Sequence, residues 1–317
     1  MYPGPSSTSS FKRSHLINTL LFAGVVIVLA LSFQYIFERK IILHSESSGS
    51  YKINRILKFT DAGEIPIFGP STAEGAFIPS LLGPEYFNYG LSGVRDDVLL
   101  FFLEQECKKV KKNPNILLVL SLDGFTYSLG EPNNYILNSN DPDVKKLIGN
   151  TYRPYYKIPF IKYYGQYEWY VKDYLTDRIN LTKYSERGAS IEKNVLTKEK
   201  FADLIAERRS WPTWFKNDSV LEKRFVNLVR NHPKRHFIIV IPPFHPSYFD
   251  QYKNYDDALH YFSWLAGFPN VSVLNYSHHF YPDDCYFNTS HLNYNGALLF
   301  NKMLKDTLPQ VLWPVLP

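Results

Sequence analysis

Ser71 and His291 are residue types that acyl transfer requires, although they lie far apart in the chain. Ser71 stands two residues after Gly69 in "FGPSTAEG", and His291 stands in "YFNTSHLNYNGALLF", just ahead of a run typical of a closing helix. A serine hydroxyl is a weak nucleophile until a neighbouring imidazole removes its proton. Acyl transfer is therefore possible only if the fold brings these two side chains together.

A glycine-rich segment offers the second requirement of this chemistry. The run "NYGLSG" contains Asn88, Gly90 and Gly93. The tetrahedral oxyanion of acyl transfer needs positioned N–H donors, and glycines let the backbone approach closely. Two more polar side chains follow apolar runs, Asp123 in "SLDGF" and His245 in "PPFHPSY". We interpret all of these as candidates for lining one site.

Five short apolar runs could position these residues. They read as strands over 64–69, 86–93, 115–123, 236–244 and 271–277. Helical patterns alternate with them, which predicts an α/β fold with a doubly wound, mostly parallel, five-stranded sheet in a three-layer sandwich. Sites in such sheets form at the carboxyl ends of the strands, where the candidate residues follow.

Helices are expected between strands over 94–112 and 255–267, and a closing helix is expected over 295–308. The alternation breaks between 124 and about 235, so we predict one domain over 64–317 with a helical, aromatic-rich insertion at about 126–235. Two helices are expected in the insertion, and the second is expected to begin at a capping box formed by Ser219 and Glu222. The tyrosine-rich run in this insertion favours packing over a sugar-binding platform.

The N-terminus has the composition of a membrane anchor. Residues 16–37 contain no charged side chain, and a helix of 22 residues spans the roughly 30 Å core of a bilayer. A disordered tail over 1–15 precedes it and a polar connector over 38–63 follows it. A cleaved signal peptide is the alternative, because Ala30 and Ser32 have the small-x-small pattern of a cleavage site. We favour a single uncleaved span with the large domain outside the cytoplasm.

Composition excludes some functions and leaves others open. The chain has 317 residues, a formal net charge of +5 and scattered basic residues, which argues against nucleic acid as a partner. Cys107 and Cys285 form no metal-binding spacing, and they could be either a pair or two buried thiols. Neither nucleotide-binding nor metalloprotease motifs occur, so we expect no cofactor and no metal.

The order of these blocks resembles the SGNH (GDSL-like) hydrolase superfamily, and within it a membrane-anchored branch that includes alginate O-acetylation proteins and the teichoic-acid D-alanylation protein. The similarity covers roughly 64–123 and 236–308, and "HLNYNGA" is its most specific match. The resemblance implies that Ser71 is the nucleophile, that His291 is the base, and that the backbone N–H groups of Ser71 and Gly93 form the oxyanion hole. It also implies a cell-envelope polysaccharide or acyl ester as substrate, and a membrane-bound acyl donor protein as partner.

Two positions depart from the family pattern. Asn288 stands where the family usually has aspartate; its carboxamide oxygen could orient the imidazole but could not stabilise an imidazolium charge. Asp283 or Asp284 could substitute for it. Asp123 stands where the third block has asparagine, and a carboxylate donates no hydrogen bond to an oxyanion unless it is protonated. We therefore expect Asp123 to orient a loop.

The sequence thus predicts a membrane-anchored serine esterase or O-acyltransferase that works through an acyl-enzyme at Ser71. Hydrolysis and transfer are not distinguished by these residues, because the same acyl-enzyme can react with water or with a sugar hydroxyl. The alternatives are a catalytically impaired envelope scaffold that keeps the fold and a glycan-binding protein that uses the aromatic insertion.

Overall fold

Five parallel strands form the central sheet in the order β2-β1-β3-β6-β7. The computed structural model describes residues 8–42, 44–59, 61–126, 141–149, 158, 163, 167–179, 182–209 and 213–315. The strands are β1 (Ile65–Phe68), β2 (Tyr86–Asn88), β3 (Asn115–Val119), β6 (His236–Ile241) and β7 (Val271–Asn275). The predicted five-stranded, parallel α/β sheet is confirmed. Each strand is shorter than its apolar run, because each predicted range included residues of the following loop.

Alternate residues of each strand enter two separate cores. In β3, Ile116 and Leu118 pack into one core and Leu117 and Val119 into the other. Because both faces of the sheet are covered, its strands consist mainly of apolar residues. The first core is covered by α2 (Gly49–Lys58), α5 (Asp96–Cys107), α10 (Ser219–Asn231) and α11 (Tyr255–Leu265). The second is covered by α3 (Ser71–Ala76), α4 (Pro79–Leu82), α9 (Lys198–Arg209) and α12 (Tyr294–Val311).

The strand order places a topological reversal beside β1. The chain passes from β1 to β2 on one side, and then crosses back to β3 on the other side of β1. Crevices at the carboxyl ends of parallel strands form at such reversals. The residues that follow β1 therefore occupy the position where a site is expected in this fold.

The segment between β3 and β6 contains more structure than the two helices that the sequence predicts. It includes α7 (Pro142–Ile148), α8 (Tyr167–Ile179), α9, α10 and an antiparallel hairpin of β4 (Lys183–Glu186) and β5 (Ala189–Glu192). The predicted capping box at Ser219 is wrong: the side chain of Asp218 caps α10 by accepting hydrogen bonds from the next turn. Most of the tyrosine-rich run lies outside the described residues.

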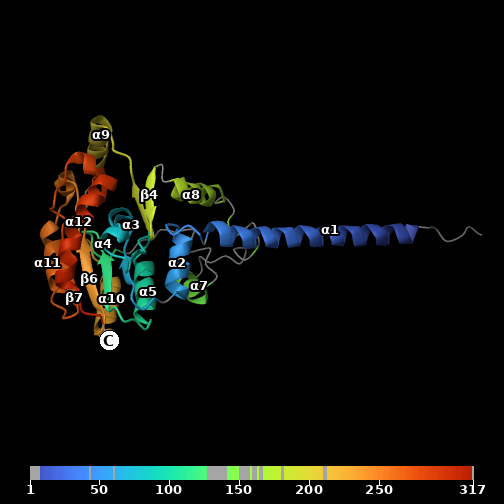
Figure 1. Cartoon of the computed structure of the whole chain (residues 1–317), viewed down its shortest axis with the longest axis horizontal. Helices are drawn as coiled ribbons and strands as arrows, with labels where there is room; N and C mark the ends of the chain where they lie inside the picture. The colour runs from blue at the N-terminus through green and yellow to red at the C-terminus, as the bar shows by residue number, and fades with distance from the viewer. Residues whose placement is uncertain are drawn as a thin grey trace, which may run out of the picture.

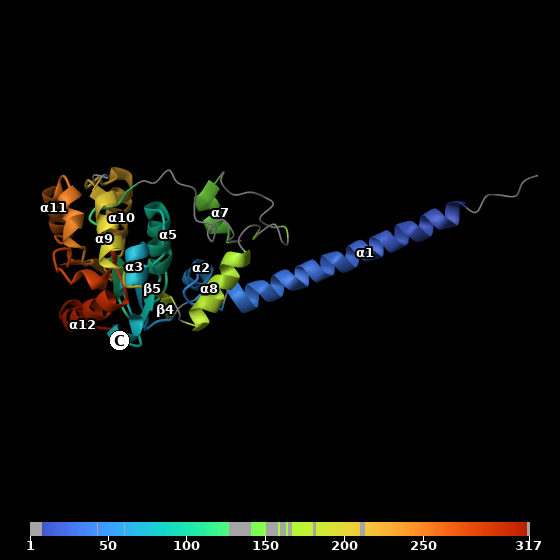
Figure 2. The same ribbon diagram turned by 90° about the horizontal axis from the view of Figure 1, so that it is seen from above.

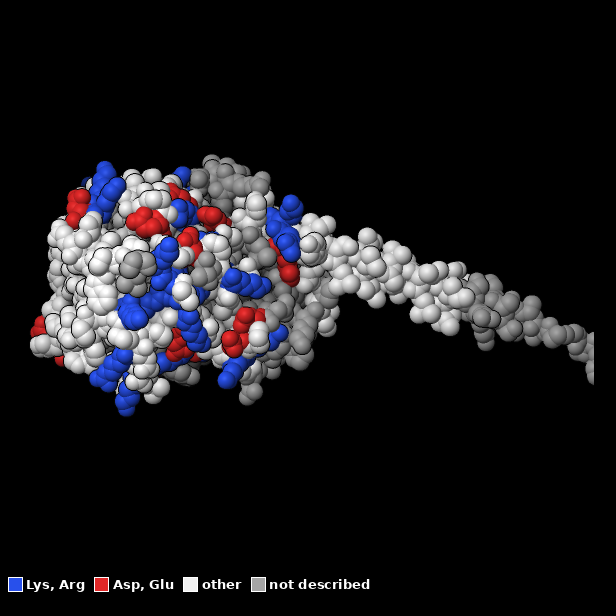
Figure 3. Space-filling model, turned by 60° about the horizontal axis from the view of Figure 1, so that its bottom comes forward, with Lys and Arg blue, Asp and Glu red and all other residues white. Residues whose placement is uncertain are grey.

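Helix α1 (Thr8–Phe37) projects away from the globular part and continues into a π-helical turn, Glu38–Ile42 (Figures 1 and 2). Within His15–Ile42, the most apolar window of 18 residues has a mean hydropathy of 2.5 and is not buried in the fold. The stretch is long and apolar enough to cross a bilayer. Figure 3 shows the contrast, with interspersed acidic and basic side chains on the globular part and none on the part of the apolar helix drawn in white.

The stretch predicted as a polar connector contains a helix that packs on the sheet. Helix α2 begins after Ser48, whose hydroxyl accepts a hydrogen bond from the Tyr51 backbone N–H at 3.1 Å. Ile53 and Ile56 then enter the first core. The chain therefore reaches the sheet within a few residues of the end of the apolar helix.

Candidate active site

Ser71 is the first residue of α3 and lies directly beyond the carboxyl end of β1. Gly69 allows this tight strand-to-helix turn, because a Cβ there would lie 2.7 Å from Ala73 Cβ and 2.8 Å from the Val119 carbonyl oxygen. Ser71 is partly exposed. Its backbone N–H is one of the first helical N–H groups, which have no acceptor within the helix.

His291 approaches Ser71 from the far end of the chain. Its Nε2 atom lies 2.8 Å from Ser71 Oγ. A small antiparallel hairpin of β8 (Tyr286–Asn288) and β9 (His291–Leu292) carries the histidine, and α12 follows directly. The distance is within the range for proton transfer between a serine and its base.

The hairpin also places Asn288 opposite His291. Asn288 Oδ1 lies 3.0 Å from His291 Nδ1 and also accepts the Ser290 backbone N–H at 3.0 Å. Because a backbone N–H can only donate, this second contact identifies the oxygen of the Asn288 amide. His291 Nδ1 therefore donates its proton to Asn288, and the lone pair of Nε2 faces the Ser71 hydroxyl.

The motif after His291 has a structural explanation. The Asn293 side chain caps α12 and donates to the Asp284 carbonyl oxygen at 2.7 Å. Gly296 allows α12 to lie against the hairpin, because a Cβ there would be 2.2 Å from the Cys285 carbonyl oxygen. These contacts fix the position of the hairpin that carries His291.

The segment that contains Gly93 adjoins the start of α3. The Leu91 backbone N–H donates to the Gly69 carbonyl oxygen at 3.0 Å, two residues before Ser71. Gly90 packs closely on α3, since a Cβ there would lie 2.3 Å from the Glu74 backbone nitrogen. Gly93 itself is exposed and has a φ of 67°, a left-handed conformation that favours glycine.

Asn88 lies beneath this segment and stabilises it. Its side chain is fully buried, donates to the Ala73 and Phe77 carbonyl oxygens at 2.8 and 3.0 Å, and accepts the Gly90 N–H at 2.8 Å. The amide thus joins α3 to the glycine segment, and both of its N–H groups are used in backbone contacts.

Asp123, in the loop after β3, and Asp96, at the start of α5, form a second group of polar residues at the carboxyl edge of the sheet. Burial raises the pKa of the Tyr252 hydroxyl, and the neighbouring Asp123 raises it further. Burial also raises the pKa of Asp96 to about 6, although its carboxylate accepts the Thr126 N–H at 2.6 Å. These contacts involve the loop after β3 rather than Ser71 or His291.

His245 and Asp284 have other partners than the Ser71–His291 pair. The buried His245 accepts the Ser247 N–H at Nδ1, so its Nε2 donates to Asp283 Oδ1 at 3.2 Å. Its backbone N–H donates to the Thr289 carbonyl oxygen at 3.0 Å, which supports the turn of the His291 hairpin. Asp284 is exposed, and its carboxylate lies near the Cys285 thiol.

Three polar residues that lie beside the candidate site were not predicted from the sequence: Ser290, Lys52 and Glu74. Ser290 Oγ lies 3.1 Å from His291 Nδ1 and 3.2 Å from Asn288 Oδ1. Lys52 and Glu74 form a buried ion pair of 2.7 Å next to the glycine segment. The sequence did contain a signal for Glu74, because this residue follows Ser71 by about one helical turn. Nothing in the sequence indicated Lys52.

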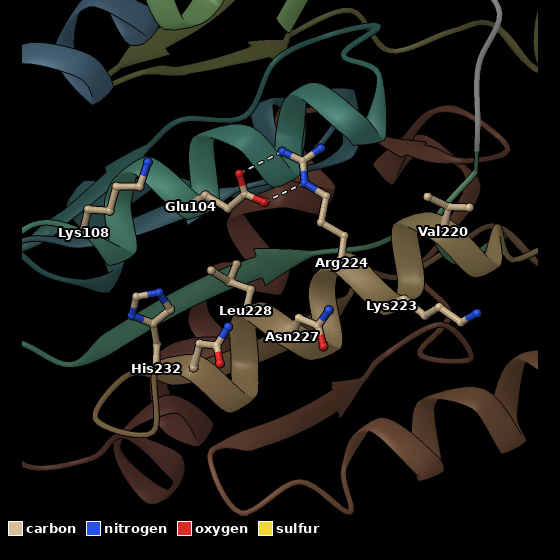
Figure 4. Close-up of a pocket in the computed structure, with 9 residues that line it drawn as sticks. Glu104, Lys108, Val220, Lys223, Arg224, Asn227, Leu228 and His232 are labelled. Carbon is tan, nitrogen blue, oxygen red and sulfur yellow. Dashed lines mark hydrogen bonds and ion pairs between the residues drawn. The ribbon is translucent and has the colours of Figure 1, made fainter.

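Other features of the described residues add no further group to the Ser71–His291 site. A surface groove of about 450 Å³ lies between α5 and α10, and its lining includes Arg224 paired with Glu104 but neither Ser71 nor His291 (Figure 4). Cys107 and Cys285 are both buried and free. Within the described ranges, no group of three or more metal-ligating side chains is assembled.

No protein-family model and no curated protein matches the chain. Among solved structures, one similar fold is a protein from Streptococcus pneumoniae described as a candidate platelet activating factor. It is 12% identical, with a TM-score of 0.42 over 88% of this chain and 99% of that chain. A TM-score of this size gives no support to a shared activity.

Proposed function

We propose that the protein is a membrane-anchored serine acyl hydrolase or O-acyltransferase. The observation that carries the proposal is the 2.8 Å contact between Ser71 Oγ and His291 Nε2, with Nδ1 held by Asn288. A serine, a base and a residue that orients the base are the parts of a nucleophilic acyl-transfer site.

In the proposed first step, Ser71 Oγ attacks the ester carbonyl carbon while His291 Nε2 takes the hydroxyl proton. The N–H groups of Ser71 and Gly93 would stabilise the oxyanion that forms on the carbonyl oxygen. The intermediate collapses when the bond to the leaving alkoxide breaks and His291 returns the proton to that oxygen. An acyl group then remains on Ser71.

In the second step, His291 removes a proton from water or from an acceptor hydroxyl, whose oxygen attacks the acyl carbon. The bond between that carbon and Ser71 Oγ then breaks, and His291 returns the proton to Ser71. Water yields a free acid, and a sugar hydroxyl yields a new ester. The SGNH-like order of the motifs and the apolar N-terminal helix support acetyl esters of cell-envelope polysaccharide as substrates, with a membrane-bound protein as acyl donor. These features also support a location of the domain outside the cytoplasm.

The proposal is tested with the full chain in detergent and a Ser71→Ala variant. We expect wild type to hydrolyse p-nitrophenyl acetate and to react with a fluorophosphonate at Ser71, and the variant to lose at least about 10³-fold in kcat/KM. Ser247→Ala is the matched control, because Ser247 Oγ also contacts a histidine, His245 Nδ1, at 2.7 Å but is buried. Equal rates in wild type and Ser71→Ala would refute the assignment.

A non-catalytic scaffold is the second candidate, and Asn288 favours it, since a neutral amide cannot stabilise an imidazolium ion. In that case the fluorophosphonate would leave Ser71 unmodified in the wild-type protein. The glycan-binding alternative has less support, because Tyr163 and Tyr170 of the insertion are buried against Phe37.

A further inference from the structure

Lys52 of α2 is a fully buried cation beside the candidate active site. Its side chain has no exposed surface, and its Nζ donates to Glu74 Oε1 at 2.7 Å and to the Gly90 carbonyl oxygen at 2.6 Å. Burying an ammonium group costs several kcal/mol unless it is paired and hydrogen-bonded. Both of its partners belong to the segments that carry Ser71 and the glycine run.

Glu74 connects these two segments. Its Oε1 atom binds Lys52, and its Oε2 atom accepts the Ser92 backbone N–H at 3.1 Å and the Ser92 hydroxyl. Ser92 directly precedes Gly93, whose N–H the proposed mechanism uses. The carboxylate therefore holds the oxyanion-binding segment against the helix that begins at Ser71.

The charge of Glu74 makes Lys52 necessary. Side chains three residues apart on a helix are neighbours, with Cβ atoms about 5–6 Å apart, so Glu74 lies close to Ser71. An uncompensated carboxylate there would oppose the negative charge that develops on the substrate oxygen. Lys52 neutralises the carboxylate while leaving its second oxygen free to hold Ser92.

We propose that Lys52 is a positioning residue for the oxyanion hole, acting through Glu74 on the Gly90–Gly93 segment. This role rests on the proposed acyl-transfer function. It assigns to α2, the helix that follows the apolar N-terminal segment, a direct part in shaping the active site.

The test compares Lys52→Met with the wild-type protein, each as the full chain in detergent. Misplacing an oxyanion donor should lower kcat for p-nitrophenyl acetate roughly 10- to 100-fold with little change in KM. Affinity for phenylboronic acid, which forms an anionic tetrahedral adduct with the serine oxygen, should fall by a similar factor. Ser92→Ala removes an exposed hydroxyl and should give a smaller loss of the same kind in a folded protein.

Lys111→Met is the matched control, because Lys111 also forms a buried ion pair, 2.8 Å from Glu106. Glu106 is in the last turn of α5 and Lys111 is in the loop before β3, so the pair lies at the opposite edge of the sheet from Ser71. It should lower the thermal midpoint of unfolding and leave kcat unchanged.

The outcomes separate the two proposals. If wild type and Ser71→Ala are equally inactive, the acyl-transfer function and the role of Lys52 both fail. If turnover depends on Ser71 but folded Lys52→Met and Ser92→Ala keep wild-type kcat and boronate affinity, only the role of Lys52 fails. If KM rises while kcat stays constant, Lys52 contributes to substrate binding and the positioning role is also rejected.

Discussion

At the scale of single residues, Asn288 decides how His291 can act. The Ser290 N–H fixes the orientation of the Asn288 amide, and its oxygen then fixes the tautomer of His291. Loss of the correct tautomer is a large part of the penalty when aspartate is replaced by asparagine in a serine-protease triad. In this protein Asn288 keeps the required tautomer of His291, so the difference from an aspartate is the missing negative charge.

We therefore predict that Asn288→Asp increases activity. An aspartate can accept the same hydrogen bonds from Ser290 and His291, and its charge would stabilise the imidazolium that the proposed attack by Ser71 requires. The expected rise in kcat for acetyl esters is roughly 10-fold, less than the 10⁴-fold cost of the full triad defect. Asn288→Leu should instead fall below wild type, and a lower kcat in Asn288→Asp than in wild type would contradict this account.

The sequence could predict Ser71, His291 and Asn288 as candidates because their motifs are local. Each lies within a few residues of a strand end or a helix start. Lys52 could not be predicted in the same way, because its role depends on contacts with residues far along the chain. Its surroundings, "SSGSYKIN", have the composition of a flexible connector.

At the scale of elements, strongly apolar strands were predictable and polar ones were not. The five sheet strands are buried on at least one face, so each leaves an apolar run in the sequence. The hairpin of β4 and β5, "KYSERGASIE", is short and mostly polar. It packs against α3 and the edge strand β2, and no local sequence pattern encodes these contacts.

Gly188 at the tip of this hairpin gives a test of that packing. It has a φ of +88°, and a Cβ there would lie 1.9 Å from the Asn88 carbonyl oxygen, while the Arg187 carbonyl oxygen accepts the Asn88 N–H at 2.9 Å. We predict that Gly188→Ala lowers the free energy of unfolding by roughly 3 kcal/mol, through backbone strain and a steric clash.

Gly149 provides the control for the strain alone. It also has a positive φ, 51°, but a Cβ there would meet no atom within 4 Å. Gly149→Ala should therefore lower the free energy of unfolding by less than Gly188→Ala, because only backbone strain opposes it. Denaturant titration of both variants checks this, and equal losses would mean that the hairpin does not pack closely on β2.

At the scale of the whole molecule, the apolar helix is joined firmly to the globular part. Phe37 is 4% exposed, and its ring centroid lies 4.9 Å from that of Tyr167 in α8. The Tyr163 hydroxyl donates to Glu38 at 3.0 Å, just after the helix. Helix α2 then begins a few residues later and carries Lys52 to the candidate active site. The end of the apolar helix is thus part of the fold.

This arrangement predicts different results for two truncations. A chain that lacks residues 1–32 should leave the membrane fraction and keep the thermal midpoint of the full chain, because Phe37 and its aromatic partners remain. A chain that lacks residues 1–42 also loses the buried Phe37 and Ile42, and should unfold at a lower temperature.

The full chain should stay with membranes after alkaline extraction, and its intact mass should show that it keeps its N-terminal residues. A mature N-terminus at Phe33 would instead identify residues 1–32 as a cleaved signal, and equal midpoints for the two truncations would show that the aromatic contacts do not stabilise the domain.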